Sequence, residues 1–311
     1  MATLSSQLTK LIGDITGSGP TPATPPPGSP YTTIYSFGDS LSDVGNDYTA
    51  SAHTVPVSPP YDNGRFTDGP VWLEDLATGM GLPPPRPSLG GGNDFAYGGA
   101  YTGSIPGHTA NPSDLSYQLT QFKAEDPHPL ANALYTVWIG ANDLISALGP
   151  GHNDFATVNA AIGNEMQFIS GLAADGASNI LVANVPDLGK TPDAIAAGAA
   201  YQAQGSAVSA YFDALLQVNL AAYGIGHPGV HISVLNSYGL LDAAIADPSA
   251  FGLTNVTSPL WSGNFIDAKS GTLATSDPKA AAGYLFFDGL HPTATGHQFI
   301  AAAAAQVLGV A

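Results

Sequence analysis

Four short apolar runs, separated by long stretches of helical periodicity, constrain the fold of this chain most. The runs are Thr32–Phe37, Leu134–Ile139, Asn179–Ala183 and His231–Leu235, with a fifth and weaker run around Asp94–Tyr97. Helical spacing of apolar residues is found in Asp154–Ala174, in Ala207–Tyr223 and in the alanine-rich Ala294–Leu308. Buried strands that alternate with helices of this length predict right-handed βαβ units. We therefore expect an α/β protein, a three-layer α/β/α sandwich with a parallel sheet of about five strands.

Proline content separates the first 30 residues from the rest of the 311-residue chain. A short helix is expected from Leu4 to Ile15, and six prolines between Gly17 and Pro30 predict an extended spacer. We therefore expect residues 1–30 to form a short segment and linker, and residues 31–311 to form one domain. The region 47–130 is too long for a plain connection, so short helices are expected near Val71–Met80 and Ser113–Glu125, among loops that wall a cleft.

Charge and cysteine content exclude several classes of function. Only 10% of the residues are charged, and 7 basic against 24 acidic residues give a formal net charge of −17. Such a surface repels phosphate backbones, so nucleic acid is not an expected partner. The chain has no cysteine, which excludes disulfides, zinc–thiolate sites and cysteine nucleophiles. Because no apolar stretch reaches the length of a transmembrane helix, stable membrane insertion is not expected either.

The N-terminal residues bear on the compartment. They lack the basic start and the apolar core of a Sec-type signal peptide. The low lysine content and the bias toward glycine, alanine and aspartate favour an extracellular or cell-surface protein that leaves by another route, with the cytoplasm as the alternative.

A serine stands at the end of the first predicted strand. Thr32–Phe37 is followed by Gly38, Asp39 and Ser40, and the carboxyl edge of the sheet is where open α/β folds bind their ligands. Near the other end of the chain, Asp288 precedes His291 by three residues. One tight turn can bring that carboxylate against the imidazole. The three side chains can then serve as the nucleophile, the general base and the group that orients the base in a serine hydrolase.

Ester hydrolysis also needs hydrogen-bond donors for the oxyanion. The candidates are the backbone N–H of Ser40, a glycine N–H within Tyr97-Gly98-Gly99 and the side-chain amide of Asn142, which follows the run Leu134–Ile139. Three strand ends that meet on one rim of the sheet favour an esterase more strongly than any single motif does.

Four blocks of the sequence resemble the GDSL family of the SGNH hydrolase superfamily. The blocks are Phe37–Asn46, Asn93–Ala100, Tyr135–Asp143 and Phe287–Thr293. The resemblance covers about residues 31–309. It implies a flavodoxin-like sheet and esterase, lipase, lysophospholipase or acyltransferase activity through an acyl-enzyme, on a small-molecule or lipid ester and without cofactor or metal.

The resemblance also assigns roles to individual residues. Ser40, Asp288 and His291 form the catalytic triad, and the oxyanion hole consists of Ser40, Gly98 and Asn142. Gly99 is the alternative to Gly98. Because a protonated histidine cannot act as a base, the activity of such an enzyme should rise through roughly pH 6–7.

Other interpretations of the same residues stay open. The site can transfer its acyl group to an alcohol instead of water, or the chain can be a non-catalytic exported interaction module. A metal site of Asp288, His291 and His297 would lack a fourth ligand. Arg65 is expected in a structural salt bridge or carbonyl clamp rather than in substrate binding, and Asp39 as a turn or cap residue.

Overall fold

The computed structural model describes residues 29–125, 130, 132–149 and 154–311. In this part of the chain four parallel strands form one sheet in the order β1-β2-β3-β4. They are β1 (Ile34–Gly38), β2 (Leu134–Trp138), β3 (Asn179–Ala183) and β4 (His231–Leu235). The α/β class and these four predicted strands are confirmed. The predicted N-terminal helix and all but the last two residues of the predicted spacer lie outside the described residues.

The fifth predicted strand is reduced to a few hydrogen bonds beside β1. Ser36 N donates to Asn93 O at 3.0 Å, and Phe95 N donates to Ser36 O at 2.8 Å. Regular pairing stops because the Asp94 carboxylate turns back onto the backbone, where it accepts from Ala96 N at 3.2 Å and from the Ser36 hydroxyl at 2.5 Å. The described sheet therefore has four strands instead of about five, and the segment at Asp94 lies at its edge, next to β1.

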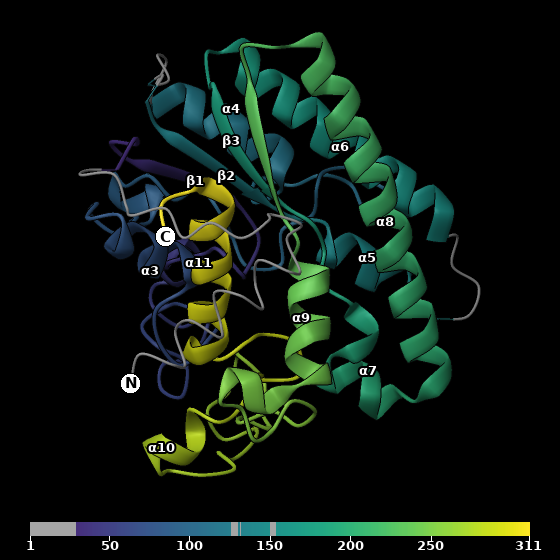
Figure 1. Cartoon of the computed structure of the whole chain (residues 1–311). Coiled ribbons are helices and arrows are strands. Elements are labelled where there is room, and N and C mark those ends of the chain that lie inside the picture. The colour runs from purple at the N-terminus through teal and green to yellow at the C-terminus, as the bar shows by residue number, and fades with distance from the viewer. Residues whose placement is uncertain (1–28, 126–129, 131, 150–153) are drawn as a thin grey trace.

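Helices cover both faces of the sheet (Figure 1). One face carries α4 (Leu115–Glu125), α5 (Ala141–Ala147), α6 (Asp154–Ala174) and α8 (Ala199–Gly226). The other face carries α3 (Trp72–Gly79), α9 (Ser237–Ala246) and α11 (Ala294–Leu308). Shorter helices are α2 (Asn46–Ala50), α7 (Pro192–Ala197) and α10 (Pro278–Ala281), and 3₁₀ turns lie at Ser88–Gly90, Leu188–Lys190 and Pro248–Phe251.

The long predicted helices are confirmed. Asp154–Ala174 and Ala294–Leu308 are helices with the predicted ends, while Ala207–Tyr223 lies inside the longer α8. The helix α8 extends further because the alanine-rich residues on its N-terminal side favour helix. The helices predicted near Val71–Met80 and Ser113–Glu125 are α3 and α4.

The strands β1, β2 and β3 are buried on both faces, which explains why they are continuous apolar runs, whereas β4 at the edge of the sheet is partly exposed, so the prediction of a buried strand there is wrong. Tyr135 and Val137 of β2 pack in the core under α6 and α8, whereas Leu134 and Trp138 pack in the core under α3 and α11. A third, small core of Tyr61, Leu260, Trp261 and Phe287 joins loops that are far apart in the sequence. Among the described residues, none of the helices combines the length and hydrophobicity needed to cross a bilayer.

Candidate active site

The turn after β1 presents Ser40. Gly38 ends the strand with a φ of +150°, and a Cβ at this position would lie 2.1 Å from Trp138 O, so a side chain cannot be accommodated. The chain then turns sharply, since Ser42 N and Asp43 N both donate to Asp39 O at 3.0 Å. The Asp39 side chain supports this turn by accepting from Leu41 N at 3.0 Å, as its predicted structural role requires.

Ser40, His291 and Asp288 are joined by hydrogen bonds. Ser40 Oγ lies 2.8 Å from His291 Nε2, and His291 Nδ1 lies 2.7 Å from Asp288 Oδ2. Asp288 also accepts from Leu290 N at 2.9 Å and from His291 N at 2.7 Å, both through Oδ1. These backbone contacts form the tight turn that places the carboxylate against the imidazole. The three predicted side chains are therefore together, although Ser40 and His291 are 251 positions apart.

Tyr61 is a further residue of this network that sequence reasoning missed. Its hydroxyl donates to Asp288 Oδ2 at 2.7 Å, the same oxygen that binds His291. Tyr61 is buried in the third core, where its ring packs edge-on against Phe287 at 4.9 Å between centroids. Its position in the sequence, between Pro60 and Asp62, gives no indication of this contact. Only the packing of the loops brings it to Asp288.

The pKa values of His291 and Asp288 are shifted in opposite directions. Burial by itself lowers the pKa of His291, but the charge and hydrogen bond of Asp288, with contributions from Asp39 and Asp193, raise that pKa above its ordinary value. Burial by itself raises the pKa of Asp288, but the charge of His291 and the hydrogen bonds from His291 and Tyr61 hold that pKa below its ordinary value. These shifts favour an ionised Asp288 beside His291.

The predicted oxyanion donors differ in how they are engaged. Gly98 N donates to Asp43 Oδ2 at 3.0 Å, whereas no acceptor among the described residues binds Ser40 N or Gly99 N. Asn142 Nδ2 donates one hydrogen to Ala100 O at 2.9 Å, and its second hydrogen has no acceptor among the described residues. The role of Gly98 as an oxyanion donor therefore stays a prediction. The N–H of the alternative, Gly99, has no acceptor among the described residues.

Arg65 and His297 have structural partners. The Arg65 guanidinium binds Glu74 through Nε and a terminal nitrogen, both at 2.7 Å, so the expected structural salt bridge is confirmed. His297 is buried in α11, and its Nδ1 accepts from Trp72 N at 3.2 Å. Burial and the nearby His291 lower the pKa of His297 to about 3, so this ring stays neutral and ties α11 to α3.

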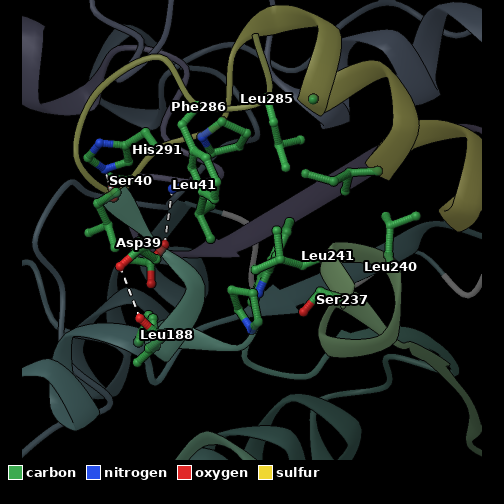
Figure 2. Close-up of a pocket in the computed structure, with 18 of the residues that line it drawn as sticks. Asp39, Ser40, Leu41, Leu188, Ser237, Leu240, Leu241, Leu285, Phe286 and His291 are labelled. Atoms are coloured by element: carbon green, nitrogen blue, oxygen red, sulfur yellow. Dashed lines mark hydrogen bonds between the residues drawn. The ribbon is translucent and has the colours of Figure 1, made fainter. Parts of the chain in front are cut away.

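A pocket opens beside the triad (Figure 2). Ser40, His291 and Asn142 line one part of it, and apolar residues of α9 and α11 line another. Figure 2 shows Ser40 next to His291, with Leu240 and Leu241 on the far side of the pocket. The arrangement gives a nucleophile, a base, an oriented carboxylate and free donors around one space, which suits attack on an ester carbonyl.

Comparisons with known proteins place the chain in one family. Residues 34–304 match the model of the GDSL-like Lipase/Acylhydrolase family. The chain is 32% identical over 242 residues to the phosphatidylcholine-sterol acyltransferase of Aeromonas hydrophila, which covers 76% of this chain and 67% of that protein. A GDSL esterase/lipase of Arabidopsis thaliana is 28% identical over 310 residues, or 84% of this chain and 82% of the relative.

Esterase EstA of Pseudomonas aeruginosa is 30% identical over 307 residues, which are 88% of this chain and 46% of EstA. The chain thus spans less than half the length of that relative. The segment that matches the family model includes the four described strands and the Ser40, Asp288 and His291 side chains. The chain therefore belongs to the GDSL-like lipase/acylhydrolase family of SGNH hydrolases and is a carboxylic-ester hydrolase by family.

Proposed function

We propose that this chain cleaves acyl esters, including lipid esters, in two steps through an acyl-enzyme on Ser40. The observation that carries the proposal is the unbroken chain of contacts from Ser40 Oγ to His291 Nε2 at 2.8 Å and from His291 Nδ1 to Asp288 Oδ2 at 2.7 Å. A serine hydroxyl is a weak nucleophile unless a base removes its proton as it attacks. Here the base is within hydrogen-bond distance and is itself oriented.

In the first step Ser40 Oγ attacks the carbonyl carbon, and its proton passes to His291 Nε2. The negative charge that develops on the carbonyl oxygen is stabilised by Ser40 N–H, by the free N–H of the Asn142 amide and by Gly98 or Gly99 N–H. The tetrahedral intermediate then expels the alcohol, which takes the proton from His291. In the second step water repeats the sequence and releases the acid, which regenerates Ser40.

A fluorophosphonate probe tests the nucleophile directly. Wild type should be labelled, and Ser40→Ala and His291→Ala should not. Ser42→Ala is a matched control, because Ser42 lies in the same turn, is buried and accepts from Trp72 Nε1 at 3.3 Å instead of contacting His291. Labelling that survives in Ser40→Ala would overturn the assignment of Ser40. A folded wild type that is not labelled would instead favour the non-catalytic interaction module.

Acyl transfer to an alcohol is the second candidate function. The relative from Aeromonas hydrophila, 32% identical over 242 residues, is named as an acyltransferase. Water and an alcohol attack the same acyl-enzyme, so the residues of the triad serve both reactions. Products formed from one p-nitrophenyl ester with and without an added long-chain alcohol or sterol separate them. A new ester as the main product indicates a transferase, and free acid alone indicates a hydrolase.

A further inference from the structure

The segment Tyr97–Ala100, which we call the glycine turn, lies beside the end of β1. Tyr97 N donates to Gly38 O at 3.2 Å, which joins this turn to the strand that precedes Ser40. Ala100 N donates to Tyr97 O at 3.2 Å and closes the turn. Gly99 has a φ of +70°, which is typical of the third residue of a type II turn. The hydrogen bond that closes the turn does not use the N–H of either glycine.

The two glycines of this turn have different surroundings. Gly98 is tightly packed, because a Cβ at this position would lie 2.3 Å from the Phe66 ring and 2.5 Å from Asp47 Oδ2. Its N–H donates to Asp43 Oδ2 at 3.0 Å. A Cβ at Gly99 would meet no atom within 4 Å. Gly98 therefore anchors the turn, and of the two glycines only Gly99 has an N–H without an acceptor among the described residues.

The acceptor of the Gly98 N–H is a buried carboxylate close to the nucleophile. Asp43 lies three residues after Ser40 and is 0% exposed. Its Oδ1 accepts from the backbone N–H groups of residues 45 and 46 at 2.7 and 2.6 Å, and its Oδ2 accepts from Asp47 N at 3.2 Å and from Gly98 N at 3.0 Å. Three of these four donors belong to the segment that follows Ser40. Asp43 thus ties that segment to the glycine turn.

We propose that Asp43 positions the oxyanion hole, because it holds the Gly98 N–H in such a way that the next N–H, that of Gly99, donates to the oxyanion. The inference rests on the proposed acyl-enzyme at Ser40. Asp43 does not contact the substrate in this scheme and acts through the glycine turn. Donors that are already in place stabilise a developing charge most, since nothing has to reorganise when the charge forms.

The glycine turn also orients a second oxyanion donor. Ala100 O accepts from Asn142 Nδ2 at 2.9 Å, and the other hydrogen of this amide has no acceptor among the described residues. A displaced turn therefore disturbs the Gly99 N–H and the Asn142 amide together. Asp43→Asn should displace it, because an amide nitrogen is a donor and cannot accept from the N–H groups that a carboxylate oxygen binds.

The test compares an ester with its thionoester, in which sulfur replaces the carbonyl oxygen. Sulfur accepts hydrogen bonds weakly, so a lost oxyanion donor slows the ester more than the thionoester. Rates with p-nitrophenyl butyrate and its thiono analogue are measured at pH 8, above the pKa of Asp43, which burial raises to about 6. Asp43→Asn should lower kcat for the ester roughly 10- to 100-fold with little change in KM, and should lower the ester-to-thionoester ratio of kcat by roughly fivefold or more.

Asp94→Asn is the matched control. Asp94 is as buried as Asp43 and accepts from Val44 N at 2.9 Å and from Ala96 N at 3.2 Å, but among the described residues no hydrogen bond joins its side chain to the glycine turn. Any loss in this variant should fall equally on both substrates and leave their ratio within about twofold of wild type. Equal losses on both substrates in Asp43→Asn would overturn the proposal, since they would show that Asp43 only supports the fold.

A measurement on wild type decides the matter if Asp43→Asn does not fold. Protein labelled with ¹⁵N-glycine is observed by NMR before and after phenylboronic acid adds to Ser40. Boron accepts an electron pair from Ser40 Oγ, whose proton passes to His291, and becomes a tetrahedral anion that resembles the intermediate. The Gly99 amide proton should move downfield, and that of Gly98 should not. A downfield shift at Gly98 in place of Gly99 would overturn the proposal, whereas folded wild type that forms no adduct and cleaves no ester would refute the acyl-enzyme on Ser40 instead.

Discussion

Asp288 and Glu165 are both buried carboxyl side chains, with exposed fractions of 5% and 0%, but their surroundings differ completely. Asp288 accepts hydrogen bonds from Leu290 N, His291 N, the His291 ring and the Tyr61 hydroxyl. Neither oxygen of Glu165 has a hydrogen-bond partner among the described residues. The pKa of Asp288 is accordingly below its ordinary value, with His291 and its hydrogen bonds outweighing burial.

Glu165 lies close enough to two other acids, Asp143 and Asp213, for their charges to affect it. Burial, together with the charges of Asp143 and Asp213, raises the pKa of Glu165 well above its ordinary value. Burial also raises the pKa of Asp143 to about 7 and that of Asp213 to about 8, against the effect of their hydrogen bonds. The comparison shows that burial alone does not decide the charge of a carboxyl. Hydrogen-bond donors and the neighbouring His291 favour the ionised form of Asp288, and the lack of such donors among the described residues favours the neutral form of Glu165.

The sharpest test of this comparison replaces each of the two carboxyls by an amide in turn. Asp288→Asn should lower kcat by about 10⁴-fold, because an amide cannot stabilise the imidazolium or hold the required tautomer of His291. Glu165→Gln should leave kcat within about twofold, because the neutral acid and the amide carry the same charge. Steady-state kinetics at pH 8 measures both. Similar losses in the two variants would contradict the distinct roles of the two carboxyls.

The second test concerns the hydrogen bond that Tyr61 adds to Asp288. Tyr61→Phe should lower kcat roughly tenfold with little change in KM, since a hydrogen bond to a charged group is lost away from the substrate. Without this donor Asp288 attracts the proton on His291 more strongly, so the midpoint of the rate–pH profile should move upward. Tyr48→Phe, in the helix α2, is the control. An unchanged midpoint in Tyr61→Phe would mean that Tyr61 only packs.

The free energy of unfolding should fall as pH rises, because the pKa of Glu165 is raised in the folded state. An acid with a raised pKa in the folded state keeps its proton there after the unfolded chain has lost it. Its contribution to stability is therefore complete below the unfolded pKa, near 4.3, and is lost as pH rises toward the folded pKa, by about 1.4 kcal/mol per pH unit for one group. Asp143 and Asp213 act in the same direction.

Urea unfolding at pH 4.5, 6 and 8 checks this expectation. Wild type should become less stable across the series, and Glu165→Gln should show a smaller decline and exceed wild type at pH 8 by roughly 1–3 kcal/mol. Parallel curves for the two proteins would show that Glu165 is ionised in the fold. Activity should show the opposite trend and rise with pH, because it needs neutral His291.

The smallest expected effect comes from Asp39. Its carboxylate contributes to the raised pKa of His291, and burial raises its own pKa to about 6. Asp39→Asn keeps an acceptor for Leu41 N but removes the charge. The midpoint of the rate–pH profile, expected above the ordinary histidine value near 6.5, should then fall by about half a unit. A profile that does not move would show that the charge of Asp39 does not contribute to the basicity of His291.

The sequence alone predicted the elements that rest on local pattern. The four strands follow from their apolar runs, of which the first three are buried on both faces, and the helices Asp154–Ala174 and Ala294–Leu308 follow from their periodicity. Ser40 and Asn142 could be placed because each follows a strand. Asp288 and His291 could be paired because one turn spans their three-residue separation. The weak fifth strand could not be resolved, since its outcome depends on the side chain of Asp94 folding back onto Ala96 N.

Tertiary structure decided the features that join distant segments. Tyr61 meets Asp288 across 227 positions, and Gly98 N meets Asp43 across 55, so no local spacing predicts either contact. The isolation of Glu165 and the apolar walls around Leu240 likewise depend on which helices pack together. The sequence by itself determined the chemistry available at the carboxyl edge, because residue type and strand end are local properties. Packing alone decided which donors stay free, which carboxyls stay charged and what space lies beside Ser40, because these properties arise only when remote side chains share one environment.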